Sequence, residues 1–203
     1  MKNYTKAKKN IEEISDGIFL VKNYISKDTA RFLIDSISPY LIETPRNQIY
    51  GALMGEEFGP IDSAEFYNED SSYNISIDIH NSLLLSINNL ISEKFKAPHK
   101  VKSYFFSCML DGAVNDMHMD NYHEDENGDI HPREKYISNR SGLLYLNDDY
   151  IGGEIVFPNQ GISIKPEAGS LLFFEGDHKK PHAVNQVVSG PRYNLVTFYE
   201  PVN

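Results

Sequence analysis

Two histidines, an aspartate and an arginine in the second half of the sequence can do chemistry together. His118 and Asp120 flank Met119, His182 lies far downstream, and Arg192 follows ten residues later. On an extended strand alternate side chains share a face, so one short strand can present His118 and Asp120 together. Two imidazoles and one carboxylate suit a divalent iron ion with positions left open for reactants. A nearby guanidinium suits a small dicarboxylate, because its N–H groups match carboxylate oxygens.

The length and composition of the chain predict one soluble globular domain, residues 1–203. Hydrophobic residues make up 40% of it, and no low-complexity tract interrupts them. The net charge of −10 repels phosphate backbones and argues against nucleic acid as a partner. No apolar run has the length of a signal peptide or a membrane span, which predicts a cytoplasmic protein with no membrane partner. Cys108 is the single cysteine, which excludes an internal disulfide bond, and its apolar surroundings predict a core thiol.

The first half of the chain, residues 1–98, predicts a strand and helices. An apolar run at 17–21 predicts a strand, and Ser26 suits the N-cap of a helix that Pro39 ends. A second helix is predicted from about residue 77 to residue 95. Between the helices, residues 44–72 are rich in glycine, proline and tyrosine, which predicts an irregular, flexible segment that acts as a lid.

The second half, residues 99–203, has the pattern of a β unit. Apolar runs alternate with glycine, proline, asparagine and aspartate, and no helical period separates them. The predicted strands are 100–110, 114–119, 142–146, 153–157, 161–164, 170–174, 183–188 and 193–199. Such strands suit a double-stranded β-helix, or jelly roll, which can hold a site between its sheets. The predicted fold class is therefore α+β, mainly β, with the N-terminal helices packed on the outside of this core.

Short motifs follow these strands in an order that is typical of one family. The motifs are Leu143-Leu144-Tyr145-Leu146-Asn147, Gly152-Gly153-Glu154, Phe157-Pro158, Ile164-Lys165-Pro166, Ala168-Gly169-Ser170-Leu171-Leu172-Phe173-Phe174, His182-Ala183-Val184 and Gly190-Pro191-Arg192-Tyr193. Over roughly residues 100 to 200 the sequence resembles the iron(II)- and 2-oxoglutarate-dependent dioxygenases of the prolyl 4-hydroxylase type. The strand and helix at the start of the chain are similar to this family too.

This resemblance implies a role for each residue of the candidate site. It implies that His118, Asp120 and His182 bind iron(II). It further implies that Arg192 binds the distal carboxylate of 2-oxoglutarate and that Tyr145 hydrogen-bonds the same carboxylate. The implied cofactors are iron(II), 2-oxoglutarate as cosubstrate and O2, with ascorbate as a reductant. Retention of Asp120 indicates hydroxylation, because halogenating relatives replace this carboxylate with a small residue.

Some residues depart from the family pattern or allow another interpretation. The turn at 109–112 lacks the tyrosine that relatives often carry, and Phe198 stands where many have tryptophan. His178 competes with His182 as the distal ligand, but the spacing to Arg192 and the following Ala-Val favour His182. The acidic segment 120–140 matches a calcium loop in part, yet a solvated loop or a loop that closes over substrate are better interpretations.

The function predicted from the resemblance is hydroxylation of prolyl residues in a peptide or protein. Oxidative decarboxylation of 2-oxoglutarate to succinate and CO2 accompanies this reaction. Tyrosines within 50–73 and 122–136 are suited to line a peptide groove, although tyrosines scattered in loops more often serve packing. Alternative interpretations are hydroxylation of another residue or of a small amino-acid-like molecule, and a non-catalytic jelly-roll module that binds a ligand. The sequence does not indicate an oligomeric state.

Overall fold

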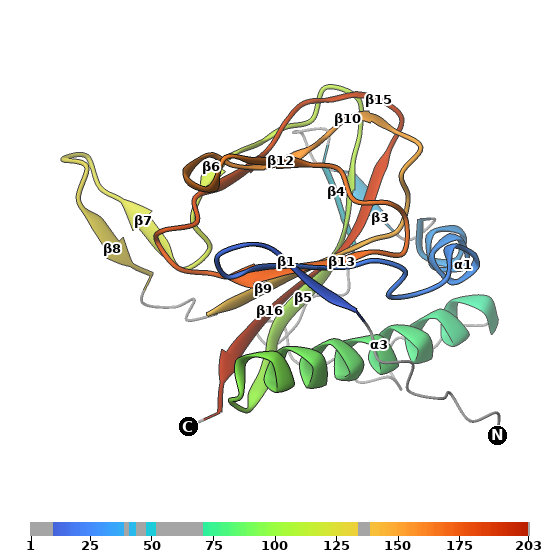
Figure 1. Cartoon of the computed structure of the whole chain (residues 1–203). Coiled ribbons are helices and arrows are strands. Elements are labelled where there is room, and N and C mark those ends of the chain that lie inside the picture. The colour runs from blue at the N-terminus through green and yellow to red at the C-terminus, as the bar shows by residue number, and fades with distance from the viewer. Residues whose placement is uncertain (1–9, 39–40, 44–47, 52–70, 134–138, 203) are drawn as a thin grey trace.

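The fold consists of two facing β-sheets with helices on the outer side of the larger sheet (Figure 1). The computed structural model describes residues 10–38, 41–43, 48–51, 71–133 and 139–202. Its elements are β1 (Ile11–Ser15), β2 (Ile18–Val21), α1 (Lys27–Ile37), β3 (Leu41–Glu43), β4 (Gln48–Gly51), α3 (Ser71–Phe95), β5 (His99–Met109), β6 (Asn115–His118), β7 (Tyr122–Glu124), β8 (Ile130–Pro132), β9 (Arg140–Tyr145), β10 (Ile151–Gly152), β11 (Ile155–Phe157), the 3₁₀ turn η2 (Pro158–Gln160), β12 (Ile162–Ile164), β13 (Leu171–Glu175), β14 (His182–Val184), β15 (Val187–Ser189) and β16 (Arg192–Pro201).

The larger sheet has eight strands in the order β1-β2-β13-β9-β16-β5-β4-β3. Every neighbouring pair in it is antiparallel. The long strand β16 lies between β5 and β9, so its backbone is paired on both sides. Its side chains alternate between the two faces. Leu195 and Tyr199 face the helices, whereas Arg192 and Val196 face the smaller sheet.

The smaller sheet has four strands in the order β12-β11-β14-β6. Strand β14 pairs with β6 in an antiparallel register that sets His182 opposite His118. The two-stranded sheet β10-β15 lies beside it, and the hairpin β7-β8 projects from the end of the jelly roll (Figure 1). The smaller sheet therefore brings together two histidines that are far apart in the sequence.

The two helices cover the outer face of the larger sheet. Ser26 is the N-cap of α1, and its hydroxyl accepts a hydrogen bond from the backbone N–H of Thr29, as predicted. Between helices and sheet lies the main core, which includes Leu33, Ile87 and Phe173. No helix in the described ranges is long and apolar enough to cross a membrane.

A second core lies between the two sheets. It contains Phe157 from the smaller sheet and Leu172 and Phe174 from the larger sheet, all fully buried. The predicted double-stranded β-helix with N-terminal helices is therefore confirmed. Cys108 is buried within β5, as the core-thiol interpretation requires, and burial raises the pKa of its thiol to about 11.

Several element boundaries differ from the sequence-based prediction. The predicted strand 183–188 is divided into β14 and β15, which belong to different sheets. Helix α3 begins at Ser71, several residues before the apolar period becomes regular. Most of the predicted flexible segment 44–72 lies outside the described residues, but its residues Gln48–Gly51 form β4 and pair with β5.

His80 creates a pH dependence in the main core. This residue of α3 is fully buried against the rings of Tyr104 and Phe106, and neither ring nitrogen has a hydrogen-bond partner among the described residues. Burial therefore lowers the pKa of His80 from 6.5 to about 3. Between these two pH values the unfolded chain binds a proton that the folded chain excludes, so stability falls as the pH falls.

We predict that replacing His80 with leucine removes this contribution. As the pH falls below 6, the free energy of unfolding of the natural chain should drop relative to His80→Leu by about 1 kcal/mol for each pH unit. Urea unfolding at several pH values between 7 and 5 measures this difference. His123→Leu, on the exposed hairpin, is the matched control. A His80→Leu difference that stays constant with pH would contradict the prediction.

Candidate active site

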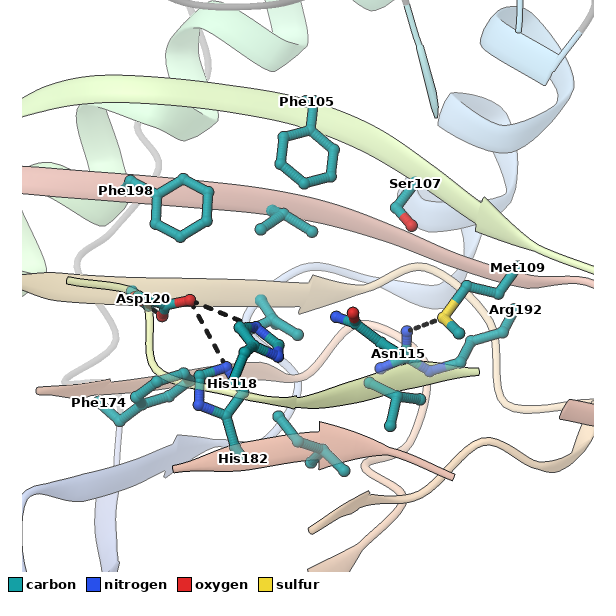
Figure 2. Close-up of a pocket in the computed structure, with 15 residues that line it drawn as sticks. Phe105, Ser107, Met109, Asn115, His118, Asp120, Phe174, His182, Arg192 and Phe198 are labelled. Carbon is teal, nitrogen blue, oxygen red and sulfur yellow. Dashed lines mark hydrogen bonds and ion pairs between the residues drawn. The ribbon is translucent and has the colours of Figure 1, made fainter. Parts of the chain in front are cut away.

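Three side chains meet at the end of β6 and the start of β14 in a geometry that fits one metal ion. One carboxylate oxygen of Asp120, just after β6, lies 3.5 Å from Nε2 of His118 and 3.6 Å from Nε2 of His182. The three ligand atoms all lie within 4.8 Å of one another (Figure 2). Ligands bound to one ion at about 2.1 Å each have mutual distances of roughly 3 to 4 Å. The structure thus brings together the three residues predicted as metal ligands.

Backbone carbonyls fix the orientation of both imidazoles. Nδ1 of His118 lies 2.7 Å from the carbonyl oxygen of Asp116, and Nδ1 of His182 lies 3.1 Å from that of Lys180. A carbonyl can only accept, so each Nδ1 carries the proton and each Nε2 keeps a lone pair for a metal. Both lone pairs are directed toward the carboxylate of Asp120.

A buried lysine holds the loop that supplies one of these carbonyls. The side chain of Lys180 is 3% exposed, and its ammonium lies 3.2 Å from both Glu175 and Asp177. A buried ammonium requires such partners, because an unpaired charge is costly in the interior. The ion pairs therefore fix the turn that precedes His182.

Asp120 is held as a carboxylate by its surroundings. Burial acts to raise the pKa of its carboxyl group, but His182, His118 and Ser141 together outweigh burial and lower that pKa. The hydroxyl of Ser141, on β9, donates a short hydrogen bond to the second carboxylate oxygen. One oxygen of Asp120 is thereby used within the protein, and the other remains for a metal.

Two aromatic rings pack against the imidazole of His182. Its ring centroid lies 4.9 Å from that of Phe174 and 5.4 Å from that of Phe157. Burial lowers the pKa of His182, which favours the neutral ring that a metal requires. The packing therefore helps to hold the imidazole of His182 in its orientation and to keep it neutral.

Arg192 lies at the other end of the same pocket, at the start of β16. Its guanidinium is buried, and its hydrogen-bonding contacts are the sulfur of Met109 at 3.5 Å and the phenol oxygen of Tyr145 at 3.3 Å. Within the described residues it makes no ion pair, and its Nε has no partner. Burial raises the pKa of Tyr145, so its hydroxyl keeps a proton to donate. The pair is thus suited to bind an anion.

A single pocket between the sheets connects the two groups (Figure 2). Asn115 lies between His118 and Arg192 in this view, and Phe105 and Phe198 lie above Asp120. Residues that the sequence did not single out as site residues also line the pocket; they are Phe105, Ser107, Met109, Asn115, Ser141, Leu143, Ile155, Phe174, Val184 and Val196.

The alternative polar candidates lie apart from the metal cluster. His178 is exposed, and its ring packs against that of Tyr122 rather than against the ligands. Residues of the acidic segment form the hairpin β7-β8, in which Asp125 accepts hydrogen bonds from the backbone of Asn127 and Asp129. Apart from Asp120, no described residue of this segment belongs to a group with metal-binding geometry.

Comparison with known proteins agrees with this geometry. Residues 104–200 match the model of the 2OG-Fe(II) oxygenase superfamily. The match covers just under half of the 203-residue chain.

Relatives match this chain over part of their length. Human prolyl 3-hydroxylase 2 is 36% identical over 64 residues, which are 29% of this chain and 9% of that protein. A PKHD-type hydroxylase of Pseudomonas paraeruginosa is 36% identical over 100 residues, which are 47% of this chain and 42% of that protein. The chain therefore spans less than half the length of these relatives.

Solved structures share the fold at low sequence identity. A viral collagen prolyl hydroxylase from Paramecium bursaria Chlorella virus-1 superposes with a TM-score of 0.62 at 17% identity, over 94% of this chain and 100% of that chain. A prolyl hydroxylase from Trichoplax adhaerens, solved with a hypoxia inducible factor peptide fragment, gives 0.63 at 17% identity, over 91% of this chain and 84% of that chain. These likenesses establish the jelly-roll fold.

The donor set fits the iron(II) that this superfamily uses together with 2-oxoglutarate and O2. His118, His182 and Asp120 offer two neutral nitrogens and one carboxylate oxygen, the set that suits iron(II) with open positions. When bound, iron(II) would supply the redox chemistry, and the protein would supply orientation and shielding.

We predict that His182→Ala lowers the affinity for a divalent metal by more than about 100-fold, because loss of a ligand should exceed the effect of losing an outer partner. Equilibrium dialysis with Mn²⁺, a redox-stable substitute, measures this affinity. His178→Ala, four residues earlier on the exposed loop, is the matched control and should retain it. Metal binding that survives His182→Ala but not His178→Ala would refute the ligand assignment.

Proposed function

We propose that the protein is an iron(II)- and 2-oxoglutarate-dependent oxygenase that hydroxylates prolyl residues in a peptide or protein. The observation that carries this proposal is the shared pocket. A metal-binding triad lies at one end, and at the other lies a buried guanidinium that makes no ion pair with a described residue. A cosubstrate with a metal-chelating 2-oxo acid at one end and a carboxylate at the other fits both ends.

Arg192 and Tyr145 would bind the distal carboxylate of 2-oxoglutarate. A buried cation without a counter-ion is costly, so an anion that enters this end of the pocket is strongly favoured. The guanidinium offers two parallel N–H groups, and the phenol of Tyr145 offers a further donor. Asn115 lies along the path between this anion site and His118 (Figure 2).

The apolar side of the pocket supports a peptidyl substrate. Phe105 and Phe198 lie on adjacent strands with ring centroids 6.2 Å apart, and Leu143 and Val196 continue this surface. A proline ring is compact and apolar, so it fits against such a wall while its carbon faces the metal. The names of the relatives, prolyl 3-hydroxylases among them, support the same substrate class.

With O2 as the oxidant, the reaction would convert 2-oxoglutarate to succinate and CO2. One oxygen atom of O2 would enter succinate and the other would enter the substrate. Asp120 occupies the position at which halogenating relatives carry a small residue, which favours hydroxylation. Ser141 holds this carboxylate, and the carbonyls of Asp116 and Lys180 hold the imidazoles, so the ligands would keep their arrangement through turnover.

We predict that Arg192→Met mainly weakens the use of 2-oxoglutarate. The KM for 2-oxoglutarate should rise on the order of tenfold or more, because a charge-assisted contact contributes about 1.5–3 kcal/mol. Succinate release with added iron(II) and ascorbate measures this change. Arg31→Met, which breaks an exposed ion pair with Asp35, is the control. An unchanged KM in Arg192→Met would remove Arg192 from the cosubstrate site.

The substrate class is tested with a library of proline-containing peptides. We expect some peptides to gain the mass of one oxygen atom on proline in parallel with succinate release, as fragment-ion mass spectra show. Succinate release without any modified proline would refute the prolyl substrate and favour another residue or a small amino-acid-like molecule. Absence of succinate release from the iron-loaded protein in every mixture would favour the non-catalytic binding module.

A further inference from the structure

Asn147 bonds to the backbone on both sides of Arg192. Its Nδ2 donates to the carbonyl oxygen of Pro191 at 2.7 Å, and its Oδ1 accepts from the N–H of Tyr193 at 2.8 Å. The opposite amide orientation would set NH2 against N–H and oxygen against oxygen, so the two contacts define one orientation. The third contact of this amide, from Nδ2 to Asp149 at 2.7 Å, supports that orientation.

These contacts replace a missing part of the β-ladder. The pairing of β9 with β16 ends where Tyr145 faces Asn194, and the N–H of Leu146 still bonds to the carbonyl of Tyr193. Beyond this point the main chain of β9 no longer provides partners for β16. The side chain of Asn147 then supplies the acceptor for the N–H of Tyr193 and the donor for the carbonyl of Pro191.

The side chain of Arg192 depends on this backbone for its direction. Its tip contacts the sulfur of Met109 and the hydroxyl of Tyr145, and the centroid of the Tyr145 ring lies 5.2 Å from the guanidinium carbon. It makes no ion pair in the described ranges. Gly153 leaves room for the arginine stem, since a Cβ there would lie 3.0 Å from Cδ of Arg192. None of these contacts is an ion pair. The direction of the guanidinium therefore also depends on the position of the backbone at the start of β16.

We propose that Asn147 is the positioning residue that aims Arg192 at the distal carboxylate of 2-oxoglutarate and so gives the site its preference for a dicarboxylate. This inference rests on the proposed function of Arg192. Asn147 does not touch the cosubstrate; it holds the two peptide groups that flank Arg192. Loss of the Asn147 amide would leave those two peptide groups without these partners, so the start of β16 could shift. The guanidinium of Arg192 would then move most, because it lies at the end of a long side chain.

The preference is measured with two ligands of equal chain length. 2-Oxoglutarate has the distal carboxylate, and 2-oxopentanoate has a methyl group in its place. Both chelate through the same 2-oxo acid, so the ratio of their dissociation constants isolates the contact with Arg192. Competition binding to the Mn²⁺-loaded protein gives both constants without turnover.

We expect Asn147→Ala to weaken 2-oxoglutarate binding on the order of tenfold while 2-oxopentanoate binding and Mn²⁺ affinity stay unchanged. Asn147→Ser, a smaller change that also cannot span both backbone groups, should show the same selective loss if the alanine variant folds poorly. In an Arg192→Met background, Asn147→Ala should have no further effect on the ratio. Asn159→Ala is the matched control, because Asn159 also donates to a distant backbone carbonyl, that of Lys179.

The outcomes separate this inference from the proposed function. A natural chain that binds both acids equally would overturn the cosubstrate role of Arg192 and the inference with it. A natural chain that prefers 2-oxoglutarate, together with Asn147 variants that retain the full preference, would overturn the inference alone. An equal loss of affinity for both acids would also overturn it, because that pattern indicates general damage to the pocket.

Discussion

The pairing of β14 with β6 is the interaction on which the candidate site depends. It sets His182 opposite His118 and places Asp120 just beyond the strand end. Each imidazole is then held by a backbone carbonyl two residues before it in the chain. The ligand geometry thus follows from strand register and local backbone. A slip of one residue in β6 would turn His118 to the opposite face and destroy the cluster.

Arg192 illustrates a different effect. The folded chain buries a charge whose desolvation is unfavourable, and a bound anion would offset this desolvation. The charge of Arg192 is buried between β5 and β9 with only weak partners. Such a group destabilises the free protein and strengthens the binding of an anion that neutralises it. Selective binding and reduced stability of the free pocket therefore have one origin. The hydrogen bonds of Asn147 to the backbone on both sides of Arg192 hold the start of β16, from which this charge extends.

Sequence reasoning found the elements whose signals are local. The Ser26 cap and the long apolar run of β5 depend on neighbouring residues, so they were predictable. The short hairpin β7-β8 has mostly exposed residues and no apolar alternation, which left it without a signal. The metal triad was recognisable through its family motif, whereas Ser141 was not. A serine that contacts Asp120 through strand packing has no spacing that the sequence displays.

The candidate site is divided between the two sheets, and this division assigns different structural effects to metal and cosubstrate. His118 and His182 belong to the smaller sheet, while Arg192 belongs to the larger one. The hydrogen bond from Ser141 to Asp120 joins the sheets at one end of the pocket. A metal alone would strengthen only that end. A molecule that reaches both the metal and Arg192 would join the sheets at a second place. Its binding energy would then also fix the distance between the sheets, and with it the position of the apolar wall that faces the substrate.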